Sequence, residues 1–338
     1  MPPLDYAGLL ARVRACRQAG DYLRADAIAR NAIAVVGRVL GQDSRELAVL
    51  LNERGILGKF LGRFADSERH YRRALAIYAQ HGEVASAGIA AILHNLGGLA
   101  HERGDHQTAY RYARRGLEVR QALAEPDPLA LAQDRAALAA ILVDLHRYDE
   151  AETLLADALT TYQSWYGPRH YEVGVTLHNL GCLRYRRGQA DAAADTLHRA
   201  YEVKRAVLGA RHPDLAITLY AQARCTCVLG DSQRAVALLR QACGLLGGVV
   251  SPDQPTLAAC RRQLAALQPG SRRLRRRLAA CTHRFRDTGR TLAELRPSRN
   301  DGTKSGGRRP GAGATRLADF RPLVRGLRVS SRFRSSRA

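Results

Sequence analysis

The chain has 338 residues, of which 46% are hydrophobic, so it is long enough to bury a core. The first ten residues hold no basic stretch followed by an apolar run, which argues against an export signal. Nowhere do about 18 uncharged apolar residues occur together, which argues against a membrane span. We therefore expect a cytoplasmic protein. The net charge of +22 is uneven: residues 269–338 hold 20 Lys+Arg and 4 Asp+Glu, which is +16 and leaves only +6 for residues 1–268. The basic character therefore belongs mainly to the last part of the chain.

A turn glycine recurs every 42 residues along the first 230 positions. It stands at Gly20, Gly62, Gly104, Gly188 and Gly230, with His146 in the fourth of six places. A small residue follows five positions later in each repeat, and a second one follows seven positions after that. These residues are Ala25, Ser67, Ala109, Ala151, Ala193 and Ala235, then Ala32, Ala74, Gly116, Ala158, Ala200 and Ala242. The same spacing occurs six times without an insertion, which indicates six structural repeats.

Each repeat is predicted to form two helices. In the fifth repeat, apolar residues recur at three and four positions on both sides of the glycine. They are Leu177, Leu180 and Leu183 before the turn, and Ala193, Leu197 and Ala200 after it. The small residues lie where two antiparallel helices cross closely, because a larger side chain there costs about 1–3 kcal/mol by overpacking. The fold class is therefore all-α.

The repeat resembles the tetratricopeptide family. The triplets Asn95-Leu96-Gly97 and Asn179-Leu180-Gly181 match its first helix, and Gly20-Asp21-Tyr22 matches its turn. The eight residues beyond the usual 34 resemble kinesin light chain repeats, whose linker is similar to residues 208–214. The resemblance covers residues 6–268 and implies a right-handed superhelical solenoid of antiparallel helix pairs, with Thr256–Leu267 as a capping helix. The fourth repeat departs from the pattern, because Ala137, Leu138 and Ala139 replace the triplet.

The resemblance also implies that the first helix of every repeat lines a concave groove. Stepping the family's inward positions by 42 residues gives the predicted lining. It consists of Arg14, Arg17, Asn52, Lys59, His94, Asn95, His101, Ala136, Ala137, Ala140, His178, Asn179, Tyr185, Arg186, Tyr220 and Arg224. Hydrogen-bond donors outnumber acceptors, and the acids near this set are Glu53, Glu102 and Asp144.

Such a lining suits an extended, partly acidic peptide or a C-terminal tail of another protein. Asparagine amides can grip a peptide backbone, and arginines can pair with carboxylates. The central contacts are expected at Asn95, Asn179, Arg186 and Arg224. The alternative is that these side chains are only solvated polar positions on a helix face.

No catalytic, cofactor or metal site is predicted. The chain contains no G-x-x-x-x-G-K-[ST], G-x-S-x-G or H-E-x-x-H motif, so we expect it not to be an enzyme. His178 and Cys182 are spaced like two metal ligands on a helix, yet no third or fourth ligand is evident, and a packing role is favoured. The seven cysteines form no C-x-x-C pair, and we expect reduced thiols.

Residues 269–338 are predicted to be a disordered, Arg-rich tail, because like charges and few apolar residues leave little to bury. Its cluster of Arg272, Arg273, Arg275, Arg276 and Arg277 could pair with nucleic-acid phosphates or an anionic membrane surface. The competing interpretation is that arginine here reflects a GC-rich genome, and that the tail has no selected function or is an out-of-frame extension.

The leading functional hypothesis is a protein- or peptide-binding adaptor. The first rival is a sensor module similar to the helical portions of bacterial signalling or transcription regulators. Only about five residues precede the first repeat, so we expect no complete regulator with a preceding DNA-binding or nucleotide-binding domain. The second rival is anion or nucleic-acid binding through the tail, and the oligomeric state is left open.

Overall fold

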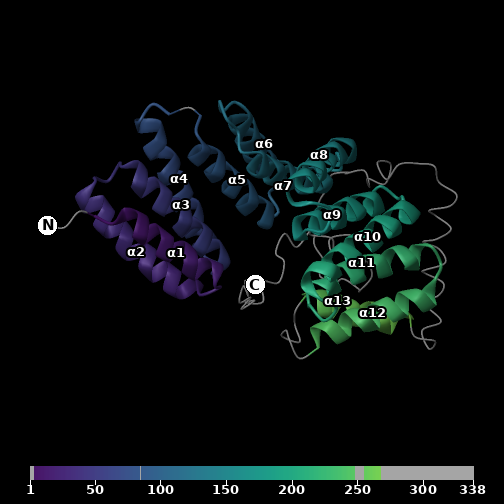
Figure 1. Cartoon of the computed structure of the whole chain (residues 1–338). Helices are drawn as coiled ribbons and strands as arrows, with labels where there is room; N and C mark the ends of the chain where they lie inside the picture. Colours follow the sequence, from purple (N-terminus) through teal and green to yellow (C-terminus); the bar gives the residue numbers. More distant parts are fainter. Residues whose placement is uncertain (1–3, 84, 248–254, 268–338) are drawn as a thin grey trace, which may run out of the picture. The chain divides into compact units, whose positions relative to one another are not determined.

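All secondary-structure elements in the described part of the chain are helices (Figure 1). A computed structural model describes residues 4–83, 85–247 and 255–267. The first helices of the six repeats are α1 (Tyr6–Gln18), α3 (Arg45–Phe60), α5 (Ala87–Glu102), α7 (Pro128–Asp144), α9 (Tyr171–Arg186) and α11 (Leu215–Val228). The second helices are α2 (Tyr22–Val39), α4 (Phe64–Gln80), α6 (His106–Gln121), α8 (Tyr148–Tyr166), α10 (Ala190–Leu208) and α12 (Ser232–Leu246), and α13 (Pro255–Leu267) follows. The predicted all-α fold is confirmed.

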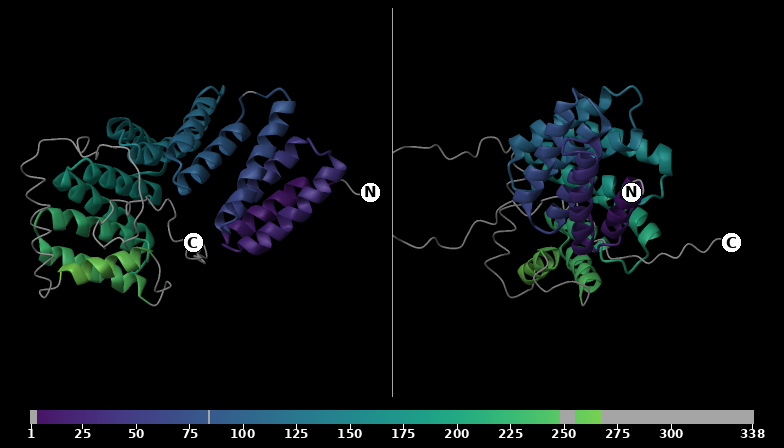
Figure 2. Two further views of the ribbon diagram at one scale, coloured as in Figure 1. Left: turned by 180° about the vertical axis from the view of Figure 1, so that it is seen from behind. Right: turned by 90° about the vertical axis from the view of Figure 1, so that its left-hand side faces the viewer.

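The chain divides after Thr176 into two compact bodies, which we call the N-terminal body (residues 4–176) and the C-terminal body (from residue 177). In the N-terminal body each helix packs against the next one in the chain, from α1 to α8, and the first helices α1, α3, α5 and α7 also touch in sequence. Figure 2 shows the purple and blue helices α1 to α4 side by side. In the C-terminal body α10 packs on α11, and α12 packs on both α11 and α13. Stacked helix pairs, as predicted, form each body.

Each first helix ends in the same hydrogen-bonded turn. In the first repeat the amide of Gly20 donates to the carbonyl of Arg17, and the amide of Asp21 donates to that of Cys16. This second bond recurs in all six repeats. The five turn glycines have φ between +76° and +88°, a region that a β-carbon disfavours. The recurring glycines therefore mark the ends of the first helices, as the sequence indicated.

His146 occupies the turn position in the fourth repeat and also has a positive φ, of 61°. It is the only residue other than glycine with a positive φ in the described ranges. Its ring lies edge-on to Tyr148, with Nδ1 2.7 Å from the tyrosine hydroxyl. This local contact helps the histidine to hold the conformation that glycine adopts elsewhere.

The small residues after each turn lie at the closest helix crossings. All six residues five positions beyond the turn are completely buried, from Ala25 to Ala235. A β-carbon placed on Gly97 of α5 would lie 3.1 Å from the backbone nitrogen of Ala113 in α6. One on Gly116 would lie 3.3 Å from the carbonyl oxygen of Ala90. Backbones this close leave no room for larger side chains.

Among the described residues, no helix is both long and apolar enough to cross a membrane. Six of the cysteines lie in this part of the chain, and all six are unbridged. The proposed boundary at residue 268 and the predicted tail, including its arginine cluster, lie at or beyond the end of the described residues.

Candidate functional site

The polar residues of the first helices contact one another from repeat to repeat. Between α1 and α3, Arg14 Nε donates to Glu53 Oε1 at 2.7 Å, and Arg17 Nε donates to Glu53 Oε2 at 3.1 Å. Glu53 is only 3% exposed, whereas the side chain of Arg14 is 47% exposed. A buried carboxylate is tolerable here because two guanidinium groups pair with it.

Two further contacts join α3 to α5. The amide of Asn95 donates through Nδ2 to Oδ1 of Asn52 at 2.9 Å, and both residues are partly exposed. Lys59 Nζ lies 3.4 Å from Glu102 Oε1. In both pairs the second residue stands 43 positions after the first, which is one repeat plus one residue. The contacts therefore follow from the repeat geometry.

The pattern continues from α5 to α7. His94 Nδ1 lies 2.7 Å from Oδ1 of Asp134, a carboxyl that is 3% exposed. Arg120 Nε, from the intervening α6, donates to the other oxygen of Asp134. Two turns of α5 further on, His101 Nε2 lies 2.8 Å from Asp144 Oδ2. We call these linked side chains of α1, α3, α5 and α7 the polar ladder.

The polar ladder changes the charge expected for this face. Sequence counting indicated a surplus of donors, with Glu53, Glu102 and Asp144 as exceptions. In the structure each of these three acids contacts a basic or imidazole side chain of the predicted lining. Within the N-terminal body the cations of the lining are therefore largely balanced by neighbouring carboxylates.

The expectation that His178 of α9 lines the groove is corrected by the structure, in which this residue is only 8% exposed. Its Nδ1 lies 3.2 Å from the hydroxyl of Thr218 in α11, and its Nε2 lies 3.5 Å from the Sγ of Cys182. Burial lowers the pKa of His178 to about 3 and raises that of Cys182 to about 12, so both groups are neutral near pH 7. His178 therefore packs between α9 and α11 and is not an exposed residue of the predicted lining.

The other predicted residues of the C-terminal body are partly exposed. They are Asn179, Tyr185, Arg186, Tyr220 and Arg224. The guanidinium carbon of Arg224 lies 5.0 Å from the centre of the Tyr185 ring, within the range of a cation–π contact. Burial raises the pKa of the Tyr185 hydroxyl, and the nearby Arg224 opposes that shift. Tyr185 and Arg224 thus hold each other in place between α9 and α11.

Sequence reasoning missed three residues that contact the predicted lining. Arg120 and Asp134 complete the contact with His94, and His106 lies beside His101 with ring centres 5.5 Å apart. A signal for His106 was present, since it stands directly after the turn where the first repeat has Tyr22. The arginine cluster from Arg272 to Arg277 lies outside the described residues.

Family models described as tetratricopeptide repeat match residues 89–129 in one case, and residues 129–206 and 183–246 in another. A curated relative, the regulatory protein AfsR of Streptomyces griseus, is 27% identical over 239 residues. That match covers 69% of this chain but only 22% of the relative. The chain therefore spans less than a quarter of that protein.

Solved structures share the fold at low identity. A signal transduction ATPase from Pyrococcus horikoshii, with a tetratricopeptide repeat sensor, superposes with a TM-score of 0.61 at 12% identity, covering 83% of this chain and 42% of that one. The Rap conjugation gene regulator of the plasmid pLS20, in complex with the Phr* peptide, gives a TM-score of 0.54 at 16% identity, covering 70% and 63%. These likenesses show a common arrangement of repeated helices.

Proposed function

We propose that this chain, which belongs to the tetratricopeptide repeat family, is a non-catalytic module that binds an extended segment of another protein or peptide through the first helices of its repeats. The family models that match it describe repeats and not an enzyme. The Rap regulator, which is similar in fold, is described as a complex with a peptide.

The pair of amides on α3 and α5 is the observation that carries the proposal. Asn52 uses its Oδ1 and Asn95 uses its Nδ2 in their mutual bond. An asparagine side chain has two donor hydrogens and an acceptor oxygen, so the amide group of Asn52 and the oxygen of Asn95 can still bond to a guest. A donor and an acceptor side by side match the carbonyl and amide of one peptide unit. Recognition of the main chain requires no particular guest sequence.

The acidic preference belongs, in this proposal, to the C-terminal body. In the C-terminal body Arg186 and Arg224 lie on first helices and are partly exposed. With Asn179 they would bind a guest carrying carboxylates, and with Asn95 they make up the four expected central contacts.

Selection from a displayed library of random peptides tests the proposal. The full chain is immobilised, and enriched peptides are measured for binding to three proteins: the wild type, Asn52→Ala/Asn95→Ala, and Gln80→Ala/Gln107→Ala. The control removes two exposed amides from the second helices α4 and α6. We expect affinity to fall at least tenfold in the first variant, since two hydrogen bonds of about 1 kcal/mol each are lost, and to stay unchanged in the control.

The C-terminal body is tested with the same peptides. The variant Asn179→Ala/Arg186→Ala should bind peptides rich in Asp and Glu more weakly than the wild type does, with a smaller loss for neutral peptides. Its helical circular dichroism signal should be unchanged. If no peptide is enriched, or if enriched peptides bind both groove variants as tightly as the wild type, the proposal is wrong.

A sensor role in a bacterial signalling or transcription system is the second candidate. It is supported by the match to the regulatory protein AfsR and by the description of the Pyrococcus horikoshii repeats as a sensor. In that case a selected peptide would change the affinity of this chain for an effector protein encoded beside it. Calorimetric titration of the two proteins, with and without the peptide, measures this coupling.

Six unbridged cysteines support a reducing compartment such as the cytoplasm. Binding of nucleic acid or an anionic surface by Arg272, Arg273, Arg275, Arg276 and Arg277 predicts steep salt dependence, which a titration of the full chain with DNA at increasing ionic strength measures.

A further inference from the structure

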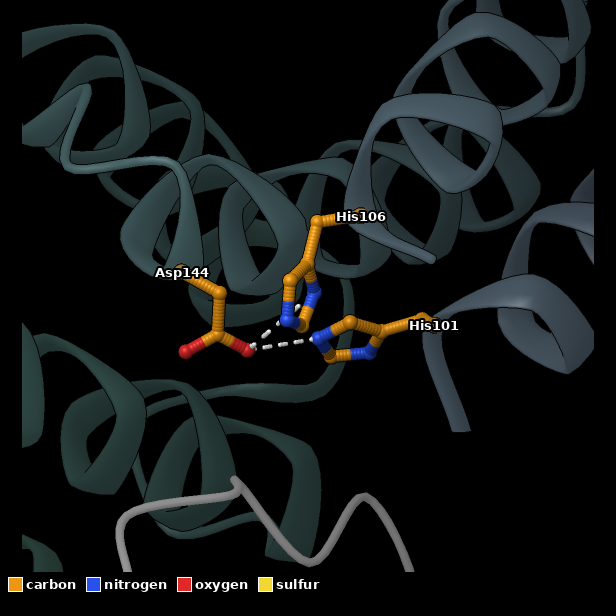
Figure 3. A group of neighbouring side chains, drawn as sticks. All are labelled: His101, His106 and Asp144. Carbon is orange, nitrogen blue, oxygen red and sulfur yellow. Dashed lines mark hydrogen bonds and ion pairs between the residues drawn. The ribbon is translucent and has the colours of Figure 1, made fainter. Parts of the chain in front are cut away.

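Two histidines and an aspartate from three successive helices converge at one point of the N-terminal body (Figure 3). His101 is the next-to-last residue of α5, His106 is the first residue of α6, and Asp144 is the last residue of α7. The tight turn at Gly104, with φ +81°, brings both imidazoles to the same side of the α5–α6 junction. Figure 3 shows both rings directed at one carboxylate oxygen.

The distances leave one of these groups without a partner. His101 Nε2 lies 2.8 Å from Asp144 Oδ2, as in a hydrogen bond. His106 Nδ1 is 3.9 Å from the same oxygen, which is too far for one. This nitrogen is buried, and it has no hydrogen-bond partner in the part of the chain that the structure describes. Buried nitrogen atoms normally have a hydrogen-bond partner, so this nitrogen stands out as one that a further ligand could satisfy.

We propose that His101, His106 and Asp144 form a binding site for a divalent transition-metal ion, with Zn²⁺ as the ion that fits it. One ligand atom from each side chain lies within 4.8 Å of the other two. A tetrahedral zinc ion with bonds of about 2.0 Å needs its ligand atoms about 3.3 Å apart. The separations of 2.8 Å and 3.9 Å from Asp144 Oδ2 to His101 Nε2 and His106 Nδ1 lie on either side of that value.

The chemistry of the donors selects the class of metal. Two imidazole nitrogens and one carboxylate oxygen suit zinc and its first-row neighbours, whereas Mg²⁺ and Ca²⁺ prefer oxygen donors throughout. Three protein ligands leave a fourth position of a tetrahedral ion for water or for a donor from a bound partner. The side chains of His101, His106 and Asp144 are 13%, 34% and 9% exposed, so the three residues lie close to the surface of the N-terminal body.

No metal site was predicted from the sequence, which contains no metal-binding motif and no C-x-x-C pair. The three proposed ligands come from positions 101, 106 and 144, in two successive repeats. A bound ion would join the third repeat to the fourth, at the end of the polar ladder. The proposal does not depend on peptide binding, since it concerns these three side chains alone.

The test titrates the metal-free full chain with Zn²⁺ and, separately, with Co²⁺ as a spectroscopic probe. We expect one ion per chain and a Co²⁺ spectrum of nitrogen and oxygen ligands, without the charge-transfer band of a thiolate. His106→Ala should lower the affinity by more than about tenfold, the smallest loss usual for a residue that merely supports a ligand. His198→Ala, which removes an exposed histidine of α10, should bind like the wild type.

Thermal unfolding supplies an independent measurement. Saturating Zn²⁺ should raise the melting temperature of the wild type and of His198→Ala, and not that of His106→Ala. Circular dichroism without metal checks that His106→Ala is folded, and Asp144→Asn replaces it if it is not. The proposal is overturned if the wild type binds no Zn²⁺, if the Co²⁺ spectrum shows thiolate ligands, or if the folded ligand variant binds as tightly as the wild type.

Discussion

The hydroxyl of Tyr71 is buried in the N-terminal core without a hydrogen-bond partner among the described residues. An unsatisfied buried hydroxyl costs about 1–3 kcal/mol, so Tyr71→Phe should raise the free energy of unfolding by about 1 kcal/mol. Tyr201→Phe is the matched control, because Tyr201 accepts a hydrogen bond from Gln241 at 3.0 Å, and its loss should be destabilising by a similar amount. Chemical denaturation measures both, and a destabilised Tyr71→Phe would contradict the assignment.

Histidines 94 and 178 show what a repeat can and cannot predict for a single residue. They stand two periods apart and were both placed on the inward face. His94 is partly exposed and contacts Asp134, whereas His178 is buried against Thr218 and Cys182. The period predicts the side of the helix to which a residue belongs. How deeply that residue is buried depends on the neighbouring side chains, which differ from repeat to repeat.

In helix α5, two adjacent glycines are expected to change the free energy of unfolding in opposite directions when each is replaced by alanine. A β-carbon on Gly97 would lie 3.1 Å from the backbone of α6, whereas one on Gly98 meets only the end of Lys59 at 3.6 Å. Gly97→Ala should therefore lower the free energy of unfolding by about 1–3 kcal/mol through overpacking. Gly98→Ala should raise it by up to about 1 kcal/mol, since alanine favours a helix. Thermal or chemical unfolding of the two variants measures both effects. Equal changes in the free energy of unfolding would contradict the close crossing of α5 and α6.

The elements themselves could be predicted from the sequence. Turn glycines such as Gly20 mark where the first helices end, and buried small residues such as Ala25 mark where the helices cross, because both features have local causes. The convergence of His101, His106 and Asp144 has no local cause. It arises from the packing of α5, α6 and α7, which a pattern within one repeat does not describe.

At the scale of the whole molecule, the charge of the predicted lining depends on contacts between repeats. Counting side chains gave a surplus of hydrogen-bond donors over acids, but the 43-residue offset brings Lys59 to Glu102 and His101 to Asp144. Such pairing is invisible to a count of residues on one helix face. The N-terminal body therefore offers a balanced polar ladder, and its amides are the groups proposed to bind a guest.

Hydrogen–deuterium exchange of the full chain, with and without a selected peptide, tests most directly whether the first helices bind the guest. We predict slower exchange, when the peptide is added, in the first helices of the repeats (α1, α3, α5, α7, α9 and α11), above all in α3 and α5 around Asn52 and Asn95. Protection confined to the even-numbered helices, with α3 and α5 unchanged, would contradict this prediction.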